Sequence, residues 1–313
     1  MKKFFVSLFV AALTSGFALA QDLESVTNAY NAAASALNGG DNKAVLAQFE
    51  SALESANVLG GDGMDIAKNC KEVIPQLYLR IGKTAAESKS FDDAIAAFKS
   101  AAAKAEEFAN NADVISEVSS LVPQMLNAKA GALLNAKNYA EAVTAYKAVL
   151  EADPENGTAL LRLGMALAAD NKVDEAIEPL KKSMEFGQEA NAKKQLANIY
   201  LKNAVACQKE KDMKGMLENA QLSVENNDSA NAQKIIGIAA LSLKQNQIAA
   251  DAFEAYLALS PKASDKAQII YQLGTALMGA GNNSKACGYF QQLKADAKWG
   301  EAATYYITTL KCN

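Results

Sequence analysis

The 313-residue sequence contains no histidine and only five prolines. Without histidine, the chain has no imidazole for a Ser-His-Asp triad, for a histidine zinc site or for acid–base catalysis near neutral pH. The scarcity of proline is typical of a helical protein, because proline breaks helices. The 31 Lys and Arg against 35 Asp and Glu give a net charge of −4. This balance argues against a nucleic-acid partner, because phosphate contacts need clustered positive charge.

Other chemical motifs are missing as well. The four cysteines form no Cys-x-x-Cys pair, which removes zinc and thioredoxin-like sites. No Gly-rich segment ends in Lys and Ser or Thr, as a phosphate loop requires, and residues 60–65 lack the spacing and final Glu of a calcium loop. We interpret residues 60–65 as a flexible connection. The sequence therefore predicts no catalytic residue, no metal site and no cofactor, and we expect the protein not to be an enzyme.

Long apolar runs are absent except at the N-terminus. Residues 4–20 are apolar with small polar interruptions, follow Lys2 and Lys3, and end in Ala18-Leu19-Ala20, the small-x-small pattern of a signal peptidase site. We expect a signal peptide of bacterial type over residues 1–20, with an uncleaved anchor as the alternative. Cleavage would leave 29 cations against 35 anions, a net charge of −6. With no later transmembrane run, we expect an exported protein, either periplasmic or else secreted or surface-associated.

After Gln21 the composition is even in Ala, Leu, Lys, Asn and Glu, which favours helices throughout. One spacing recurs: a small residue, a small or β-branched residue twelve positions later, and a bulky residue four positions after that. The sets are Ala33, Val45, Phe49; Gly82, Ala94, Phe98; Ala130, Ala142, Tyr146; Gly164, Ala176, Leu180; Gly237, Ala249, Phe253; and Gly274, Ala286, Phe290. One segment departs, because Ala197 lies eighteen residues before Gly215.

Close packing of two antiparallel helices explains this spacing. The first small residue would let the second helix approach, and the second small residue would lie opposite it. The bulky residue would then fill the seam between neighbouring hairpins. The pattern predicts an array of helix hairpins.

These residues resemble the tetratricopeptide repeat family, whose pattern is aromatic-x-x-Leu-Gly-x-x-Tyr, then Ala-x-x-x-Phe, then Pro. The final Pro is present at Pro154 and Pro261, and Ala130 and Gly164 are separated by the family's period of 34 residues. The resemblance implies an all-α protein, a right-handed α-solenoid over residues 21–313 with about seven repeats. We place the repeats at 23–59, 68–110, 121–154, 157–188, 189–227, 228–261 and 264–298, and a capping helix at 300–312.

Three repeats carry extra residues. We expect the residues between Phe49 and Pro75, and those between Phe98 and Pro123, to lengthen the second helices or to add a short helix. Each proline would then begin the next unit, since proline suits the first turn of a helix. In the fifth repeat we expect six extra residues to lengthen both helices.

Two cysteines stand where a disulfide could join the last helices. Cys287 begins the second helix of the last hairpin and Cys312 ends the capping helix, so antiparallel packing would bring them to the same level. We predict a Cys287–Cys312 bridge that constrains the unfolded chain by about 3 kcal/mol. Two small buried thiols are the alternative. We expect Cys70 and Cys207 to be free and buried.

Within this family, a partner is usually held on a concave surface lined by the first helix of each hairpin. Helical geometry, counted from each small residue, predicts which side chains face that surface. The candidate residues are Lys83, Asn127, Asn135, Asn191, Lys194, Asn198, Lys202, Asn231, Lys234 and Tyr271. Four are lysines in an acidic chain, and asparagine pairs well with a peptide backbone. Lys194 and Asn198 also resemble the Lys and Asn pair with which some members hold a terminal carboxylate.

These observations predict an exported, non-catalytic scaffold that binds a protein or peptide, with an acidic peptide as one candidate, in cell-envelope assembly or maintenance. An ordinary solvated helix face is the alternative interpretation of the candidate residues. A self-assembling envelope module and an enzyme acting on envelope polymers are the alternative functions.

Overall fold

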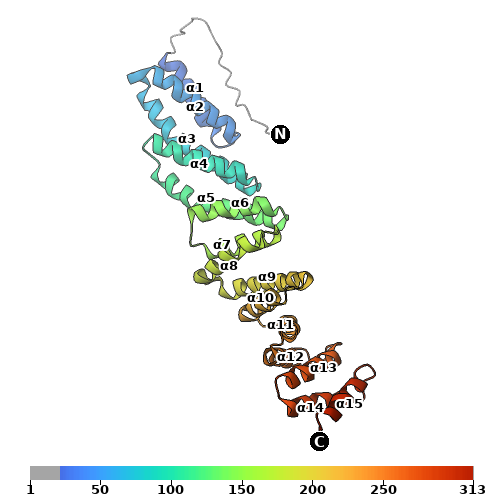
Figure 1. Ribbon diagram of the computed structural model, residues 1–313. Coiled ribbons are helices and arrows are strands. Elements are labelled where there is room, and N and C mark those ends of the chain that lie inside the picture. Colours follow the sequence, from blue (N-terminus) through green and yellow to red (C-terminus); the bar gives the residue numbers. More distant parts are fainter. Residues whose placement is uncertain (1–21, 313) are drawn as a thin grey trace. The chain divides into compact units, whose positions relative to one another are not determined.

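The computed structural model describes residues 22–312, so the expected signal peptide at 1–20 lies outside the described residues. The described part is helical and contains no strand. Its α-helices are α1 (Leu23–Ala36), α2 (Asn42–Val58), α3 (Met64–Glu87), α4 (Phe91–Glu107), α5 (Ala112–Asn135), α6 (Tyr139–Ala152), α7 (Gly157–Ala169), α8 (Val173–Ser183), α9 (Glu189–Glu210), α10 (Met213–Asn226), α11 (Ala230–Ser242), α12 (Asn246–Leu259), α13 (Lys266–Gly279), α14 (Asn283–Gln292) and α15 (Gly300–Thr309) (Figure 1). A 3₁₀ turn, η1 (Gly60–Gly63), and a π-helical turn, η2 (Met184–Gln188), connect α2 to α3 and α8 to α9.

The chain divides into two compact units, Met1–Lys129 and Ala130–Asn313, and the boundary falls within α5. We call them the N-terminal and the C-terminal unit. Each contains successive antiparallel helix pairs, so the prediction of an all-α solenoid of helix hairpins is confirmed, while the handedness of its superhelix stays a prediction. No helix in residues 22–312 has both the length and the apolar character needed to cross a membrane.

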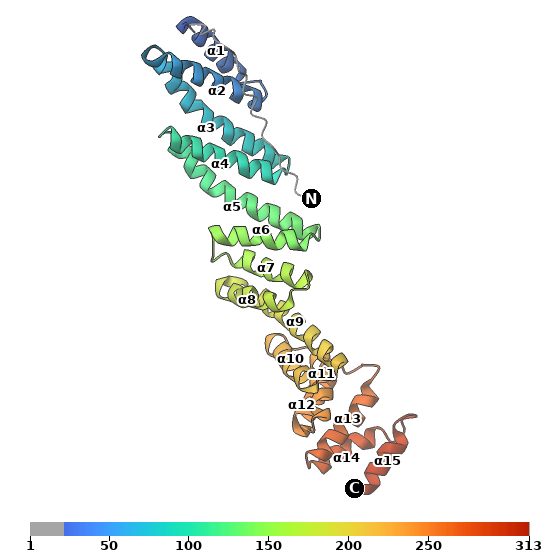
Figure 2. The ribbon, with the colours of Figure 1, turned by 45° about the horizontal axis from the view of Figure 1, so that its top comes forward.

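In the N-terminal unit, α1 packs on α2, α2 on α3 and α3 on α4 (Figure 1). Phe49 of α2 and Phe98 of α4 are fully buried in its core. In the C-terminal unit, each helix from α9 to α15 packs on the next one along the chain (Figure 2). One apolar cluster there extends from Ala204 of α9 to Ala303 of α15, so the capping helix is part of the same core.

The recurrent spacing has a direct structural meaning. A Cβ added to Gly82 would lie 2.5 Å from the ring of Phe98, and one added to Gly237 would lie 2.4 Å from the ring of Phe253. The glycine therefore makes room for the bulky residue sixteen positions later in its own hairpin. This differs from the expectation that the bulky residue mainly fills the seam to the next hairpin, because ring and glycine meet where the two helices are closest. Gly164 with Leu180, and Gly274 with Phe290, repeat the arrangement.

The hairpin turns are equally regular. Lys89 lies seven residues after Gly82 and adopts a left-handed conformation, with φ of 59°. The next N–H, that of Ser90, donates to the carbonyl of Ala85 at 2.9 Å, which is the Schellman motif that closes a helix. Other left-handed turn residues are Lys137, Asn171, Lys211, Lys244 and Gly281.

This turn corrects our interpretation of the fifth hairpin. Its first helix, α9, has 22 residues and its second, α10, has 14, so only the first is lengthened and the expectation for both was wrong. The left-handed residue is Lys211, so the small residue seven positions before it is Ala204, not Ala197. Twelve and sixteen residues after Ala204 stand Met216 and Ala220, both fully buried. The large and the small side chain have exchanged places along α10, and both are still part of the core.

The two prolines were also placed wrongly. Pro75 and Pro123 do not begin helices but lie inside α3 and α5, each of which has 24 residues. Residues 64–74 continue α3 backwards because Ala67, Cys70 and Ile74 are buried on one side of it. Tertiary burial on that face offsets the hydrogen bond that a proline removes. The extra residues thus lengthen first helices, which was not expected. They also lengthen the second helices α2 and α4, which have 17 residues each against 14 in α6, and add the 3₁₀ turn, as expected.

The predicted disulfide between Cys287 and Cys312 is present, with the two Cα atoms 5.5 Å apart. It fastens the end of α15 to α14. Cys70 is free and buried, as expected, and burial raises the pKa of its thiol to about 11. Cys207 is free but only partly buried, so its expected burial was wrong.

Candidate binding surfaces

The predicted groove residues lie on first helices of the hairpins, but the structure gives them different surroundings. In the N-terminal unit, Lys83 of α3 forms an ion pair with Glu117 of α5 at 2.7 Å. Both side chains are 45% exposed, so water screens the pair and it adds little stability. The charge of Lys83 is nevertheless offset by a carboxylate. Asn127 is half-buried and its Nδ2 donates to the carbonyl of Pro123 at 3.2 Å.

In the C-terminal unit, Lys234 of α11 is the centre of a polar cluster. Its ammonium pairs with the carboxylate of Asp265 and lies 5.9 Å from the ring centroid of Tyr256. The hydroxyl of Tyr256 donates to the same carboxylate at 2.5 Å. The cluster joins α11 and α12 to the start of α13. Lys234 therefore holds two successive hairpins together and offers no uncompensated charge to a partner.

The electrostatics of this cluster are mutual. The Lys234 ammonium, with the Tyr256 hydroxyl, holds the pKa of the Asp265 carboxyl below its ordinary value. The hydrogen bond to Asp265 raises the pKa of Tyr256 to about 12. The carboxyl of Asp265 is therefore ionised and the hydroxyl of Tyr256 protonated over the physiological range.

Tyr271 of α13 belongs to the capping interface. Its ring stacks on Trp299 with centroids 4.6 Å apart, and Phe290 stacks on Tyr306 at 4.8 Å. Burial, followed by a hydrogen bond with Tyr306, raises the pKa of Tyr271. The ring packs the last hairpin against α15 and is only partly available to a ligand.

Four predicted residues come together on α9: Asn191, Lys194, Asn198 and Lys202, all exposed. Two of them form long hydrogen bonds: Asn191 with Gln188, and Lys202 with Asn171, each at 3.4 Å. Lys194 and Asn198 have no hydrogen bond or ion pair within residues 22–312. We call these four residues the α9 row. Moving the reference residue from Ala197 to Ala204 leaves its face nearly unchanged, because seven residues make almost two helical turns.

Asn231 and Asn135 remain single exposed positions. Asn231 lies near the start of α11 and Asn135 is the last residue of α5. The structure therefore keeps one cluster of the ten predicted residues, the α9 row, and assigns Lys83, Lys234 and Tyr271 to contacts within the fold. The partners Glu117 and Asp265 lie 34 and 31 residues further along the chain, so spacing within one hairpin could not reveal them.

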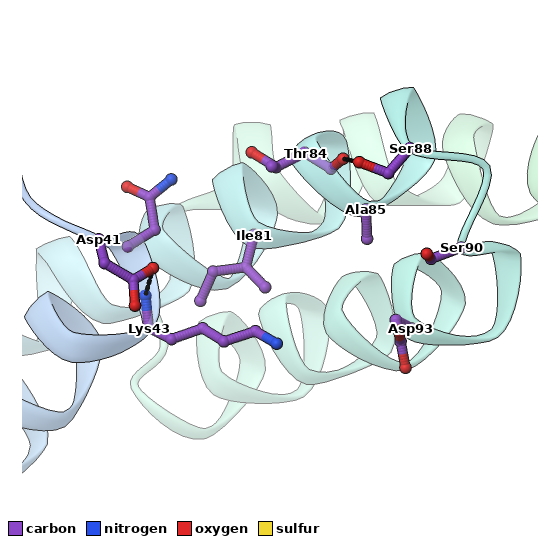
Figure 3. A pocket seen from close by; sticks show the side chains of 9 residues that line it. Asp41, Lys43, Ile81, Thr84, Ala85, Ser88, Ser90 and Asp93 are labelled. Carbon is purple, nitrogen blue, oxygen red and sulfur yellow. Dashed lines mark hydrogen bonds between the residues drawn. The ribbon is translucent and has the colours of Figure 1, made fainter.

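The N-terminal unit contains pockets that the sequence pattern did not predict. One of about 210 Å³ lies between the start of α2 and the turn from α3 to α4 (Figure 3). In it, Asp41 caps α2 by accepting from the N–H of Lys43 at 3.3 Å, and the Ser88 hydroxyl donates to the carbonyl of Thr84. The Lys43 side chain extends past Ile81 in the direction of Asp93 (Figure 3). Asp41 and Ser88 thus complete helix ends, and the side chain of Lys43 is exposed.

Two further pockets adjoin the bend between α2 and α3, with volumes of about 500 and 290 Å³. Both are lined by Asn57 and Phe108. Their walls come largely from the residues outside the recurrent spacing, which is why the repeat pattern missed them. The sequence signal that could have indicated these pockets is the presence of extra residues before Pro75 and before Pro123. Within residues 22–312, no three His, Cys, Asp or Glu side chains are grouped to hold a metal ion.

Comparison with known proteins gives two matches to the tetratricopeptide repeat, over residues 127–188 and 268–297. No curated protein matches the sequence. The chain is similar to the crystal structure of MamA, at 23% identity and a TM-score of 0.37, over 56% of this chain and 95% of that one. It is also similar to YrrB, described as a TPR protein with an unusual peptide-binding site, at 20% identity, a TM-score of 0.36, and 58% and 91% coverage. MamA from Desulfovibrio magneticus RS-1 is similar at 16% identity, a TM-score of 0.34, and 55% and 92% coverage.

Proposed function

Because this chain is a tetratricopeptide-repeat protein, we propose that it is a non-catalytic scaffold that holds a protein or peptide partner on the first helices of its hairpins. The observation that carries the proposal is the α9 row. Lys194 and Asn198 are exposed one helical turn apart, without partners among the described residues. Exposed, uncommitted donors on a rigid helix are what an acceptor-rich partner needs.

Rigidity supplies the physical mechanism. In the hairpin that carries the α9 row, Ala204, Met216 and Ala220 are buried in one core, and the N–H of Asp212 closes the turn by donating to the carbonyl of Cys207 at 2.9 Å. These contacts fix the backbone of the hairpin before a partner arrives. Binding then orders only the long side chains, at about 0.5–1.5 kcal/mol each. Such preorganisation lets a modest number of contacts hold a partner.

The charge of the α9 row favours an acidic partner. Lys194 and Lys202 are exposed and neither is paired with a carboxylate in residues 22–312, whereas Lys193 on the same helix is paired with Glu189 at 2.5 Å. Because the whole chain is acidic, an acidic partner would be repelled at a distance and held only at such a local basic surface.

We further propose that the protein is exported, most simply to the periplasm, and that it acts in the cell envelope. The signal-peptide pattern at residues 1–20 supports export. The Cys287–Cys312 disulfide supports it independently, because such bonds persist in oxidising compartments.

The test is charge reversal on the α9 row. Lys194→Glu with Lys202→Glu should abolish crosslinking of the partner in the native envelope, as read by mass spectrometry. The matched control is Lys147→Glu with Lys182→Glu, which makes the same charge change at exposed positions of the second helices α6 and α8. Lys234 is left intact, because glutamate there would face Asp265 and destabilise the hairpin. Equal partner recovery from both double variants would refute the proposal.

A further inference from the structure

The two adjoining pockets at the bend between α2 and α3 form one site, which we call the Phe108 cleft. The larger has a volume of about 500 Å³, within the range of ligand-binding sites, and the smaller one adds about 290 Å³. Ala56, Ala67 and Ile74 are buried along its floor, and Phe108 borders both halves. Met64, which lines the larger half, is 66% exposed. An apolar centre is thus open to solvent within a single unit.

The segment that carries Phe108 is held in place from both sides. The N–H of Asn110 donates to the carbonyl of Ala105 at 3.1 Å, which closes α4 through the left-handed Ala109. The next residue, Asn111, donates from Nδ2 to the carbonyl of Glu72 at 3.1 Å and accepts from Gln76 at 3.1 Å. These bonds tie the segment to α3, so the wall of the cleft is preorganised.

Charge is distributed unevenly along the cleft. At one end Lys68 and Lys71 of α3 have no ion pair in the described part of the chain, and the Lys71 ammonium lies 5.9 Å from the Phe108 ring centroid. Glu72 is the carboxylate that lines this half, and it pairs with neither lysine. Lys104, in the other half, is neutralised by Glu107 at 2.8 Å. The α3 end is therefore basic.

The opposite end is acidic. Glu50 and Glu54 of α2 line it one helical turn apart. Glu50 accepts a hydrogen bond from the Tyr78 hydroxyl at 2.9 Å, and Glu54 is exposed and unpaired in residues 22–312. From Glu50 to Asn57, α2 rises about 10 Å, which equals about three extended peptide residues.

We propose that the Phe108 cleft binds an extended peptide segment whose apolar residues lie between acidic and basic side chains. The acidic side chains lie against Lys68 and Lys71, the apolar residues against Phe108, and the basic side chains against Glu54. Opposite charges at the two ends also set the direction of the peptide. This site goes beyond the scaffold function proposed above, because it lies in the N-terminal unit and shares no residue with the α9 row.

The test uses the full chain and two synthetic probes, acetyl-Glu-Glu-Leu-Leu-Lys-Lys-amide and the same residues in reverse order, each with a neutral dye. Fluorescence anisotropy should detect binding of at least one probe, weakening with added salt. Lys68→Glu with Lys71→Glu should lower that affinity at least about tenfold. Lys43→Glu with Lys99→Glu is the matched control, with the same charge change at exposed positions of the same unit, and should leave affinity within about twofold.

A charge-swapped probe separates a lost contact from a misfolded protein. A probe with lysine in place of its two glutamates should bind the Lys68→Glu, Lys71→Glu variant better than the control variant. The Glu54→Lys variant should independently bind the original probe with lower affinity, and it should bind a probe with glutamate in place of the two lysines with higher affinity. No binding of either probe, or equal binding to all variants, would overturn the cleft assignment. Loss of probe binding in the Lys194→Glu, Lys202→Glu variant would also overturn the assignment, because these residues lie outside the cleft. If instead the α9 row proves not to bind the envelope partner, binding of the probe to the cleft should be unchanged.

Discussion

The two units use the same hairpin contact but surround it differently. Gly82 accommodates Phe98 in the N-terminal unit just as Gly237 accommodates Phe253 in the C-terminal unit. The N-terminal unit, however, adds residues before its prolines, forms the Phe108 cleft and lies almost wholly outside the two repeat matches. The C-terminal unit has short first helices, apart from α9, and a disulfide at its end. Insertion is therefore tolerated wherever it leaves the contact across the turn unchanged.

Insertions are tolerated there because only the spacing around the hairpin turn has to be kept. The small residue, the closed turn and the bulky residue are joined through one short loop, so a change in length between them would move the ring off the glycine. The start of a first helix has no such constraint, since added turns only extend a face that already packs. Met64–Glu87 shows this: α3 continues backwards from Pro75 without altering the distance from Gly82 to Phe98. The residues added at the start of α3 also line the Phe108 cleft.

The largest expected effect tests whether the contact is shared. Gly82→Leu and Gly237→Leu should each destabilise their own unit by about 3 kcal/mol, the upper range for overpacking, because their Cβ atoms would start within 2.5 Å of a ring. Gly288→Ala is the control in α14, where an added Cβ meets nothing within 4 Å, and should stabilise by about 0.5–1 kcal/mol. Urea unfolding followed by circular dichroism measures all three. If only one of the two leucine variants were destabilised, the glycine–ring contact would not have the same role in both units.

The second effect belongs to the C-terminal unit alone. Cys287→Ala with Cys312→Ala should lower the stability of that unit by about 3 kcal/mol, because the bridge closes a loop with a sequence separation of 25. The loss should appear against the oxidised wild type and vanish when both proteins are measured in reductant. Thermal unfolding provides the readout. Equal melting temperatures without reductant would contradict it.

A third effect compares two tyrosines, one in each unit. Burial, then the hydrogen bond to Glu50, raises the pKa of Tyr78 to about 12, and the hydrogen bond to Asp265 raises that of Tyr256 to about 12. A raised pKa favours the protonated form in the folded state. The stabilisation is therefore complete below about pH 10, the unfolded value, and is lost as the pH rises through about 12.

Absorbance titration of tyrosinate measures this. Tyr78→Phe and Tyr256→Phe should each remove one late-titrating group, and each variant should lose less stability than the wild type between pH 10 and 12. Tyr305→Phe is the control, because that side chain is 65% exposed. Removal of a group that titrates near pH 10 by either of the first two variants would disprove the shift.

The smallest effect concerns the turns. Lys89→Gly and Lys244→Gly should each stabilise by about 1 kcal/mol, since both lysines have φ of 59°, a conformation that costs an L-residue about 1–2 kcal/mol and glycine little. The control is Lys99→Gly inside α4, which should destabilise by about 1 kcal/mol. Denaturant midpoints measure both. Opposite signs for Lys89 and Lys244 would show that the turns of the two units differ.

Sequence predicted what local register determines. Gly237, Phe253 and the disulfide partners follow from counting along one or two helices. Pro75 was misplaced because a proline signals a helix start only when no apolar face precedes it, and Ala67, Cys70 and Ile74 form such a face. The candidate site was harder to predict, because side chains change role through distant contacts.

Lys234 illustrates this limit. Its helical position indicated a groove, yet Asp265, 31 residues later, neutralises it. The Phe108 cleft depends on α2, α3 and the end of α4 meeting at one bend, which no spacing within a repeat encodes. Lys194 and Asn198 were predicted correctly as exposed neighbours because both lie on one helix.

The exchange of Met216 and Ala220 has a consequence for how such chains evolve. Both residues lie on α10, so replacing only one of them would either overpack the core or leave a cavity, and the two positions have to change together. A profile that scores each column separately would penalise both positions although the core is filled. We therefore expect positions 216 and 220 to covary, a signal that similarity at either position alone would miss.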